Sequence, residues 1–161
     1  MNDFSFLKKY VLPSEHVEAP PGQKHVFYPL NKREVEEAEQ RLNRTFPKEL
    51  REFYFQIGYG FLCNNQVSFT TRIMDLHSIA DLILGEDFWE DYDLVDEIAE
   101  RPHRFPFFEL GNDSLIFLDL SQETSAGIHP VDYAGIIIAD SIEEFVRKLD
   151  ARENYYLFIE I

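Results

Sequence analysis

The sequence has a single cysteine, no long apolar run and few basic residues in its second half. The lone Cys63 excludes an internal disulfide and a zinc site built from several cysteines. No apolar run approaches the ~18 residues that a membrane-spanning helix needs. The start of the chain also lacks the basic and then apolar pattern of a signal peptide. These absences predict a cytoplasmic protein without a membrane segment.

Motifs of common catalytic and metal sites are missing as well. The sequence has neither the G-x-S-x-G turn of many hydrolases nor the G-x-x-x-x-G-K-[ST] loop that binds phosphates. Its five histidines lack the H-E-x-x-H or H-x₃-H spacing of zinc ligands, and its acidic runs lack the calcium-loop pattern. Cys63 lies in a predicted strand, where a buried structural thiol is expected. We therefore expect no metal, no cofactor and no catalytic site.

The chain has a net charge of −15, and its acidic residues are concentrated in one part of it. Residues 1–72 contain 10 Lys or Arg and 9 Asp or Glu, whereas residues 73–161 contain 5 and 21. Such a field repels phosphate backbones and anionic lipid head groups. The charge therefore argues against nucleic acid and membranes as partners and favours a basic protein. A role in solubility alone is the other interpretation.

Length and composition fit one domain over residues 1–161. The chain is 45% hydrophobic and 15% aromatic, which is enough to form a core at this size. Residues 1–30 form a predicted arm that prolines interrupt, but its aromatic residues indicate that it packs on a core formed by residues 31–161. Within the arm, residues 4–11 fit a short helix or a strand, and residues 25–30 fit an extended segment.

The first predicted helix begins after Asn31, a good N-cap residue. Glu34 stands three residues later, as a capping box requires. Glu37 and Arg41 have the spacing of an i,i+4 ion pair. We expect Asn43 to end the helix. Its apolar face consists of Val35, Ala38 and Leu42.

A second helix and a run of mixed elements follow. The helix is predicted to begin at Pro47 and to end at Gly58-Tyr59-Gly60, with Leu50, Phe53, Tyr54 and Ile57 on its apolar face. The next predicted elements are strands at 61–63 and 67–71 joined by Asn64-Asn65, with an extension of the second strand over 73–76. A short helix capped by Ser78 is predicted after them. An acidic helix is then predicted over 86–100, and its apolar stripe consists of Phe88, Tyr92, Val95 and Ala99.

The last third of the chain predicts a sheet and a closing helix. Residues 105–110 and 114–120 flank Gly111-Asn112-Asp113, which is a hairpin signal. Residues 115–118 are apolar on both faces, which predicts a central, covered strand. Further strands are predicted at 127–133, 136–138 and 155–161. A helix capped by Ser141 and Glu144 is also predicted. Its apolar face consists of Ile142, Phe145, Val146 and Leu149. This order of elements indicates an α+β fold.

Several segments also occur in an order typical of one superfamily. The Leu42-Asn43-Arg44-Thr45-Phe46-Pro47 junction, the helix after it and Gly58-Tyr59-Gly60 resemble a signature written E-x-x-L-G-x-x-L-P-x-D-Y-R-x-F-L with a later G-G. Phe107-Phe108-Glu109-Leu110-Gly111-Asn112-Asp113, Leu118-Asp119-Leu120 and Ala139-Asp140-Ser141-Ile142-Glu143-Glu144-Phe145 resemble its later strands and helix start. Over residues 31–150 the chain thus resembles the SUKH superfamily, the Smi/Knr-like proteins. Asn43, Phe46 and Ile142 stand where that family usually has glycine, leucine and phenylalanine.

The resemblance implies N-terminal helices packed on a single mainly antiparallel sheet, with a C-terminal helix and no catalytic site. Many bacterial members of the superfamily are immunity proteins that neutralise secreted toxins, often nucleases, and fungal members are adaptor-like regulators of cell-wall assembly. The first hypothesis is therefore a non-enzymatic immunity protein that binds a cognate toxin. An intracellular adaptor is the alternative, and an enzyme is the third possibility. The sequence predicts no oligomeric state.

The sharpest candidate site is the acidic segment between Arg72 and Arg101. Its 28 residues include ten Asp or Glu and no Lys or Arg. A nuclease holds phosphates with basic residues, so an acidic surface can occupy the same groove. A solvated acidic helix whose Trp89 packs inward is the competing interpretation. If the segment binds a basic partner, the expected contact residues are Asp87, Trp89, Glu90, Asp91, Tyr92, Asp93 and Glu97.

Overall fold

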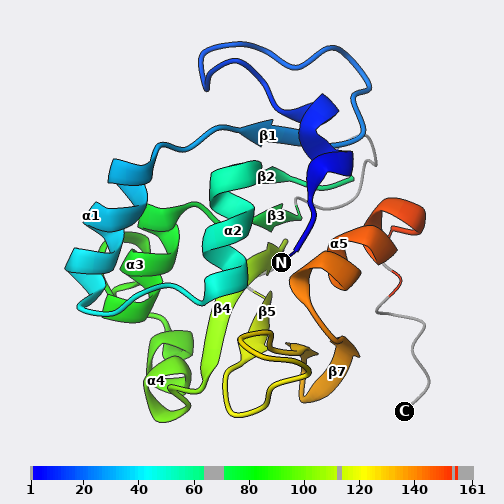
Figure 1. Ribbon diagram of the computed structural model, residues 1–161. Helices are drawn as coiled ribbons and strands as arrows, with labels where there is room; N and C mark the ends of the chain where they lie inside the picture. The colour runs from blue at the N-terminus through cyan, green and yellow to red at the C-terminus, as the bar shows by residue number, and fades with distance from the viewer. Residues whose placement is uncertain (1, 64–70, 112–113, 154, 156–161) are drawn as a thin grey trace.

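The computed structural model describes residues 2–63, 71–111, 114–153 and 155 (Figure 1). Its first half contains the 3₁₀ helix η1 (Ser5–Tyr10), β1 (Val26–Tyr28), α1 (Lys32–Leu42), α2 (Lys48–Gln56), β2 (Tyr59–Phe61), β3 (Arg72–Ile73) and α3 (Leu76–Leu84). Its second half contains the 3₁₀ turn η2 (Asp87–Trp89), α4 (Asp93–Glu100), β4 (Arg104–Leu110), β5 (Ser114–Asp119), β6 (Val131–Tyr133), β7 (Ile136–Ala139) and α5 (Ile142–Ala151).

The described strands form one open sheet of seven strands in sequence order. Each strand pairs antiparallel with the next, and β4 with β5 is the most extended pair, from Arg104 opposite Asp119 to Leu110 opposite Ser114. In Figure 1, α2 and α5 lie over one face of the sheet, while α1, α3 and α4 are stacked along one side. The predicted α+β fold, with helices before a single antiparallel sheet and a helix after it, is confirmed.

The core lies between the sheet and these helices. Residues 115–118 of β5 are all buried, as predicted for a central strand. Phe145 of α5 is fully buried, and its ring lies 5.8 Å from that of Phe107 and 5.0 Å from that of Phe108. The predicted apolar faces of α1, α2 and α5 are buried as well.

The predicted capping box of α1 is present. The Asn31 side chain accepts a hydrogen bond from the Glu34 amide at 2.9 Å, and the Glu34 carboxylate accepts one from the Asn31 amide at 2.8 Å. The predicted ion pair between Glu37 and Arg41 is wrong. Glu37 instead accepts from Arg33 at 2.7 Å, because that arginine lies one turn earlier on the same side. The Arg41 guanidinium is drawn away by two carboxylates at and beyond α3.

Three predictions in the middle of the chain are wrong. The strand predicted over 73–76 ends at Ile73, and α3 begins at Leu76. Its N-cap is Asp75 rather than Ser78, because the Asp75 carboxylate accepts from the Ser78 amide at 2.9 Å. The acidic helix predicted over 86–100 is broken into η2 and α4, since Tyr92 between them is extended, with a ψ of +130°, and Asp87 at the start of η2 has a left-handed φ of +52°.

Some predicted elements are shorter than expected or fall outside the described residues. The strand predicted over 127–133 begins only at Val131. The predicted turns at Asn64-Asn65 and at Asn112-Asp113, and nearly all of the strand at 67–71, lie outside the described ranges. Of the strand predicted at 155–161, only Tyr155 is described.

The predicted arm contacts the rest of the protein through buried side chains. Phe4 and Leu7 are fully buried, and the Phe4 ring lies 4.9 Å from that of Phe53. His25 is also fully buried. Its Nδ1 accepts from the Cys63 amide at 2.9 Å, so its Nε2–H donates to Asp150 at 2.8 Å. One imidazole, directly before β1, thus contacts the segment after β2 and α5. The division into arm and core stays a prediction.

We expect acid to destabilise the protein through His25. Burial lowers its pKa, and the hydrogen bond to Asp150 offsets this effect only in part. An unfolded histidine has a pKa of ~6.5. The contribution of neutral His25 to stability is therefore full above that pH and is lost as the pH falls towards the lower folded pKa. Urea denaturation followed by circular dichroism between about pH 7.5 and 5 measures this loss.

The matched variants are His25→Gln and His16→Gln, because the His16 side chain is 86% exposed. We expect His25→Gln to cost about 1–3 kcal/mol at pH 7.5 and to flatten the pH dependence. His16→Gln should leave both quantities unchanged. A pH dependence that survives His25→Gln would contradict this role.

Candidate interaction surface

Three carboxylates of the acidic segment hold the structure together. Asp75 contacts Arg72 at 3.1 Å. Asp81 and Glu86 each contact Arg41 at 2.5 Å, and these two hydrogen bonds raise the pKa of Arg41. The Arg41 contacts fix the end of α3 and the start of η2 against α1. These three acids are therefore occupied within the molecule.

The other seven carboxylates of the segment are exposed, and none has an ion pair or hydrogen-bond partner among the described residues. All five acids of the predicted contact set belong to this group. Unpaired exposed carboxylates keep their full charge available to a partner, which favours fast encounter with a basic surface. We name these residues the acidic surface: Asp87, Glu90, Asp91, Asp93, Asp96, Glu97 and Glu100.

Helix stability explains only part of this arrangement. Asp93 and Asp96 lie in the first turn of α4, where negative charge is favourable beside the helix N-terminus. Glu97 and Glu100 lie beyond that turn, four residues after Asp93 and Asp96. Like charges at this spacing oppose helix formation by about 0.2–0.5 kcal/mol a pair. The acidic surface is therefore not the arrangement that would stabilise α4 best.

The aromatic residues beside the acidic surface are oriented differently from the prediction. Trp89 is 4% exposed and packs edge-to-face with Tyr92, their ring centroids 5.3 Å apart. Phe88 is 65% exposed, so the predicted stripe is wrong at this residue and at exposed Ala99. The inward packing that the sequence left open holds for Trp89, whose role in partner binding stays a prediction. Phe88 is the most exposed aromatic side chain of the acidic segment, and Tyr92 is half-buried. Apolar periodicity did not predict the exposure of Phe88, because the helix is broken there.

Phe88 stands in surroundings typical of a protein interface. Leu84, four residues earlier at the end of α3, is also exposed, at 41%. Asp87 precedes Phe88, and Glu90 and Asp91 follow it closely. A reachable aromatic ring with charged neighbours is the composition of a binding hot spot. The acidic surface therefore includes an apolar contact as well as charge.

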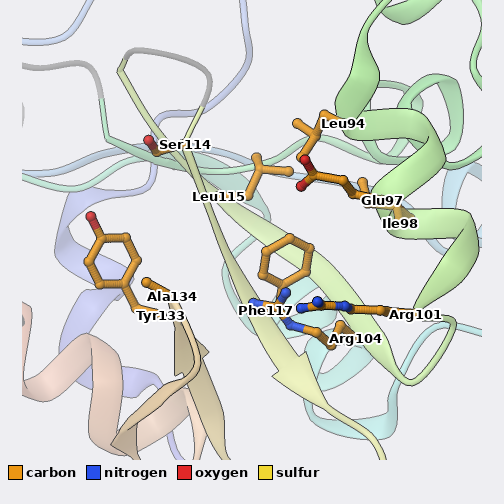
Figure 2. Close-up of a pocket in the computed structure, with 10 residues that line it drawn as sticks. All are labelled: Leu94, Glu97, Ile98, Arg101, Arg104, Ser114, Leu115, Phe117, Tyr133 and Ala134. Atoms are coloured by element: carbon orange, nitrogen blue, oxygen red, sulfur yellow. The ribbon is translucent and has the colours of Figure 1, made fainter.

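A groove opens beside the acidic surface, between α4, the sheet and the turn from β6 to β7 (Figure 2). Its volume is about 280 Å³, and Glu97 is the residue of the predicted contact set that lines it. Arg104 lies on its floor, with the guanidinium 4.2 Å from the centre of the Phe117 ring and 3.2 Å from Asp132. The groove is therefore small.

Features that would indicate other chemistry are weak in the described part of the chain. No three His, Cys, Asp or Glu side chains there are grouped so that they could hold a metal ion. Within the same residues, no helix is both long and apolar enough to cross a bilayer. Cys63 is buried as predicted but lies beyond the end of β2, and burial raises its pKa to about 11. A thiol with so high a pKa is a poor nucleophile at neutral pH.

Comparisons with known proteins bear on the family. Immunity protein YxxD of Bacillus subtilis (strain 168) is 36% identical over 134 residues, which cover 81% of this chain and 87% of that protein. No solved structure matches significantly. The similarity to this immunity protein agrees with the prediction of a non-enzymatic protein. Residues 29–148 match the SMI1 / KNR4 family (SUKH-1), so the chain belongs to that family.

Proposed function

We propose that this protein is an immunity protein that neutralises a cognate toxin by binding it stoichiometrically. The similarity to YxxD supports this function, because it extends over most of both chains. In this proposal the protein acts by covering a surface of the toxin and performs no chemistry. The toxin is basic where it is bound, as a nuclease is around the phosphates of its substrate.

The observation that carries the proposed binding mode is the acidic surface with Phe88 among its charges. Its seven carboxylates have no partner in the described structure, so a basic toxin replaces water rather than an existing ion pair. Complementary charge raises association rates towards ~10⁸ M⁻¹s⁻¹ or more at low salt. Phe88 then supplies apolar burial at the centre of the contact.

Co-expression tests the function. The toxin candidate is the product of the gene beside the one that encodes this protein, expressed in a bacterial host with and without it. We expect the candidate to stop growth alone and growth to resume when this protein is present, together with a complex that co-purifies. If the neighbouring product is toxic but is neither bound nor neutralised, the proposal is wrong. If no neighbour is toxic, the adaptor role is favoured instead.

Phe88→Ser is expected to weaken toxin binding without unfolding the protein. The ring is 65% exposed, so its removal costs the core little, whereas an interface aromatic contributes strongly to affinity. We expect the Kd, measured by isothermal titration calorimetry, to rise at least about tenfold.

The matched control is Phe55→Ser on α2, because Phe55 is 45% exposed and lies outside the acidic surface. This control should bind as the wild type does. Equal weakening by both variants, or no weakening by Phe88→Ser, would remove Phe88 from the interface.

A further inference from the structure

We propose that the groove beside α4 accepts a carboxylate side chain, Asp or Glu, that projects from the basic surface of the toxin. This inference rests on the proposed function and adds a second, oppositely charged contact to it. The groove is lined by Leu94 and Glu97 from α4, Arg101 after that helix, Arg104 from β4, and Leu115 and Phe117 from β5 (Figure 2). The acidic surface therefore continues directly into a site with arginines.

The pleat of the sheet brings a cation and its acceptor to the same face. In the antiparallel register, Phe117 of β5 lies opposite Asp132 of β6. Side chains that stand opposite one another point to the same side of a sheet. Arg104 of β4 reaches this face and donates to Asp132 at 3.2 Å. Asp132 is 8% exposed and also accepts from the Gly135 amide at 2.9 Å. Its carboxylate is therefore shared between Arg104 and that amide.

Donors of both arginines are left without an acceptor in the described structure. Figure 2 shows the side chains of Arg101 and Arg104 converging beneath the Phe117 ring. Arg101 has no acceptor among the described residues, and the buried Nε of Arg104 has none either. Asp132 thus accepts from Arg104 but not from Arg101 among the described residues. A guanidinium is always charged and presents its N–H groups as a planar fork that matches a carboxylate.

The surroundings of the groove favour a carboxylate on a protein over a phosphate of nucleic acid. Glu97 lines the same groove, and the rest of the acidic surface lies beside it. This field repels a polyanion, whereas a basic protein that carries one acid is attracted as a whole. Leu94, Leu115 and Phe117 also give the groove an apolar wall that suits the aliphatic part of Asp or Glu. The charge on α4 then attracts the toxin, and the groove selects the partner whose acid is correctly placed.

A peptide titration tests the groove without the toxin. The probe is acetyl-Leu-Glu-amide, added to ¹⁵N-labelled full-length protein and followed by NMR, with acetyl-Leu-Gln-amide and inorganic phosphate as comparisons. We expect Arg101 and the amides of Ser114 and Phe117 to shift with the Glu peptide, with a Kd of about 1 mM. The Gln peptide and phosphate should shift them far less. Absence of shifts, equal shifts with the Gln peptide, or stronger shifts with phosphate would each overturn the proposal.

Variants of Arg101 separate recognition from a structural role at the end of α4. Arg101→Lys keeps the positive charge beside the helix C-terminus but loses the fork, and Arg101→Gln loses both. We expect Arg101→Gln to abolish the peptide shifts and Arg101→Lys to weaken them. Arg33→Gln, which makes the same change of charge on α1, should leave them unchanged. Shifts that persist in folded Arg101→Gln would contradict the inference.

The toxin provides the second arm of the test. Arg101→Gln should weaken toxin binding by about tenfold, mainly through faster dissociation, because it removes a short-range contact. If the wild type binds and neutralises the toxin but Arg101→Gln binds equally well, the groove is not used while the proposed function stands. If the wild type does not bind, the proposed function fails, and the peptide titration still decides whether the groove takes a carboxylate.

Discussion

Association with the toxin is expected to slow about a hundredfold at low salt when five acids of the predicted contact set are changed to lysine. The substitutions are Asp87→Lys, Glu90→Lys, Asp91→Lys, Asp93→Lys and Glu97→Lys. Each changes the charge by two, so together they move the net charge of the chain from −15 to −5. The acids are exposed and unpaired among the described residues, so the fold should survive. Stopped-flow fluorescence measures the rate constant, and the difference should shrink as salt screens the charges.

A charge-matched control distinguishes a local interface from overall attraction. Glu15, Glu18, Glu36, Glu123 and Asp140 are exposed acids outside the acidic segment. Changing these five to lysine alters the net charge by the same amount but leaves the acidic surface intact. We expect this variant to associate within a few-fold of the wild-type rate. If both variants slow association equally, the acidic surface is not the contact, and the charge acts only through the protein as a whole.

Gly60→Ala is expected to remove a large part of the stability of the fold. Gly60 of β2 lies opposite Phe27 of β1, and its φ is +151°. A Cβ at this residue would lie 2.1 Å from the Val26 carbonyl oxygen, so β1 would have to move away from the sheet. We expect a loss of about 4 kcal/mol or more, a size that single substitutions rarely reach. Because a domain is stable by about 5–15 kcal/mol, such a variant is close to unfolding.

Gly22→Ala is the matched control, because Gly22 has a φ of +76° but no heavy atom within 4 Å of an added Cβ. It carries the cost of a left-handed alanine, about 1 kcal/mol, without the clash. Urea denaturation of both variants gives the two free energies of unfolding. If Gly60→Ala is no less stable than Gly22→Ala, the close approach of β1 and β2 is incorrect. Gly60 is thus a structural requirement of the Gly-Tyr-Gly junction.

Local sequence rules predicted the ends and apolar faces of several helices. The capping residues Asn31 and Ser141 and the left-handed Asn43 occur where expected, because each acts within three or four residues of its own position. The two apolar faces of β5 also predicted its central place, since both faces of a covered strand must be apolar. These features depend on short stretches of chain, which the sequence displays directly.

Contacts between distant elements could not be predicted in this way. Arg41 has a suitable acid one turn earlier, but Asp81 of α3 and Glu86 after it supply competing carboxylates that no helical spacing reveals. Glu49 of α2 is fully buried and accepts from the His129 amide at 2.9 Å, a contact across 80 residues. Apolar periodicity likewise predicted that Phe88 points inward, and it left the orientation of Trp89 undecided. Helical periodicity does not hold across these two residues, because the backbone is left-handed at Asp87 and extended at Tyr92.

The groove was missed for the same reason. Its arginines are close in sequence, but Asp132 and Phe117 come from other strands, and only the register of β5 and β6 brings them together. The sequence showed Arg101 merely as the end of an acidic run. The unpaired donors became visible once their neighbours were in place.

The most direct test of neutralisation by binding is a titration of purified toxin activity with the purified protein. Activity should fall linearly to zero at one equivalent of wild-type protein. The five-lysine variant of the acidic surface should need a large excess, whereas the charge-matched control should behave as the wild type does. Full activity in the presence of excess wild-type protein would contradict the account. Loss of activity at far less than one equivalent would also contradict it, because it would indicate catalytic inactivation.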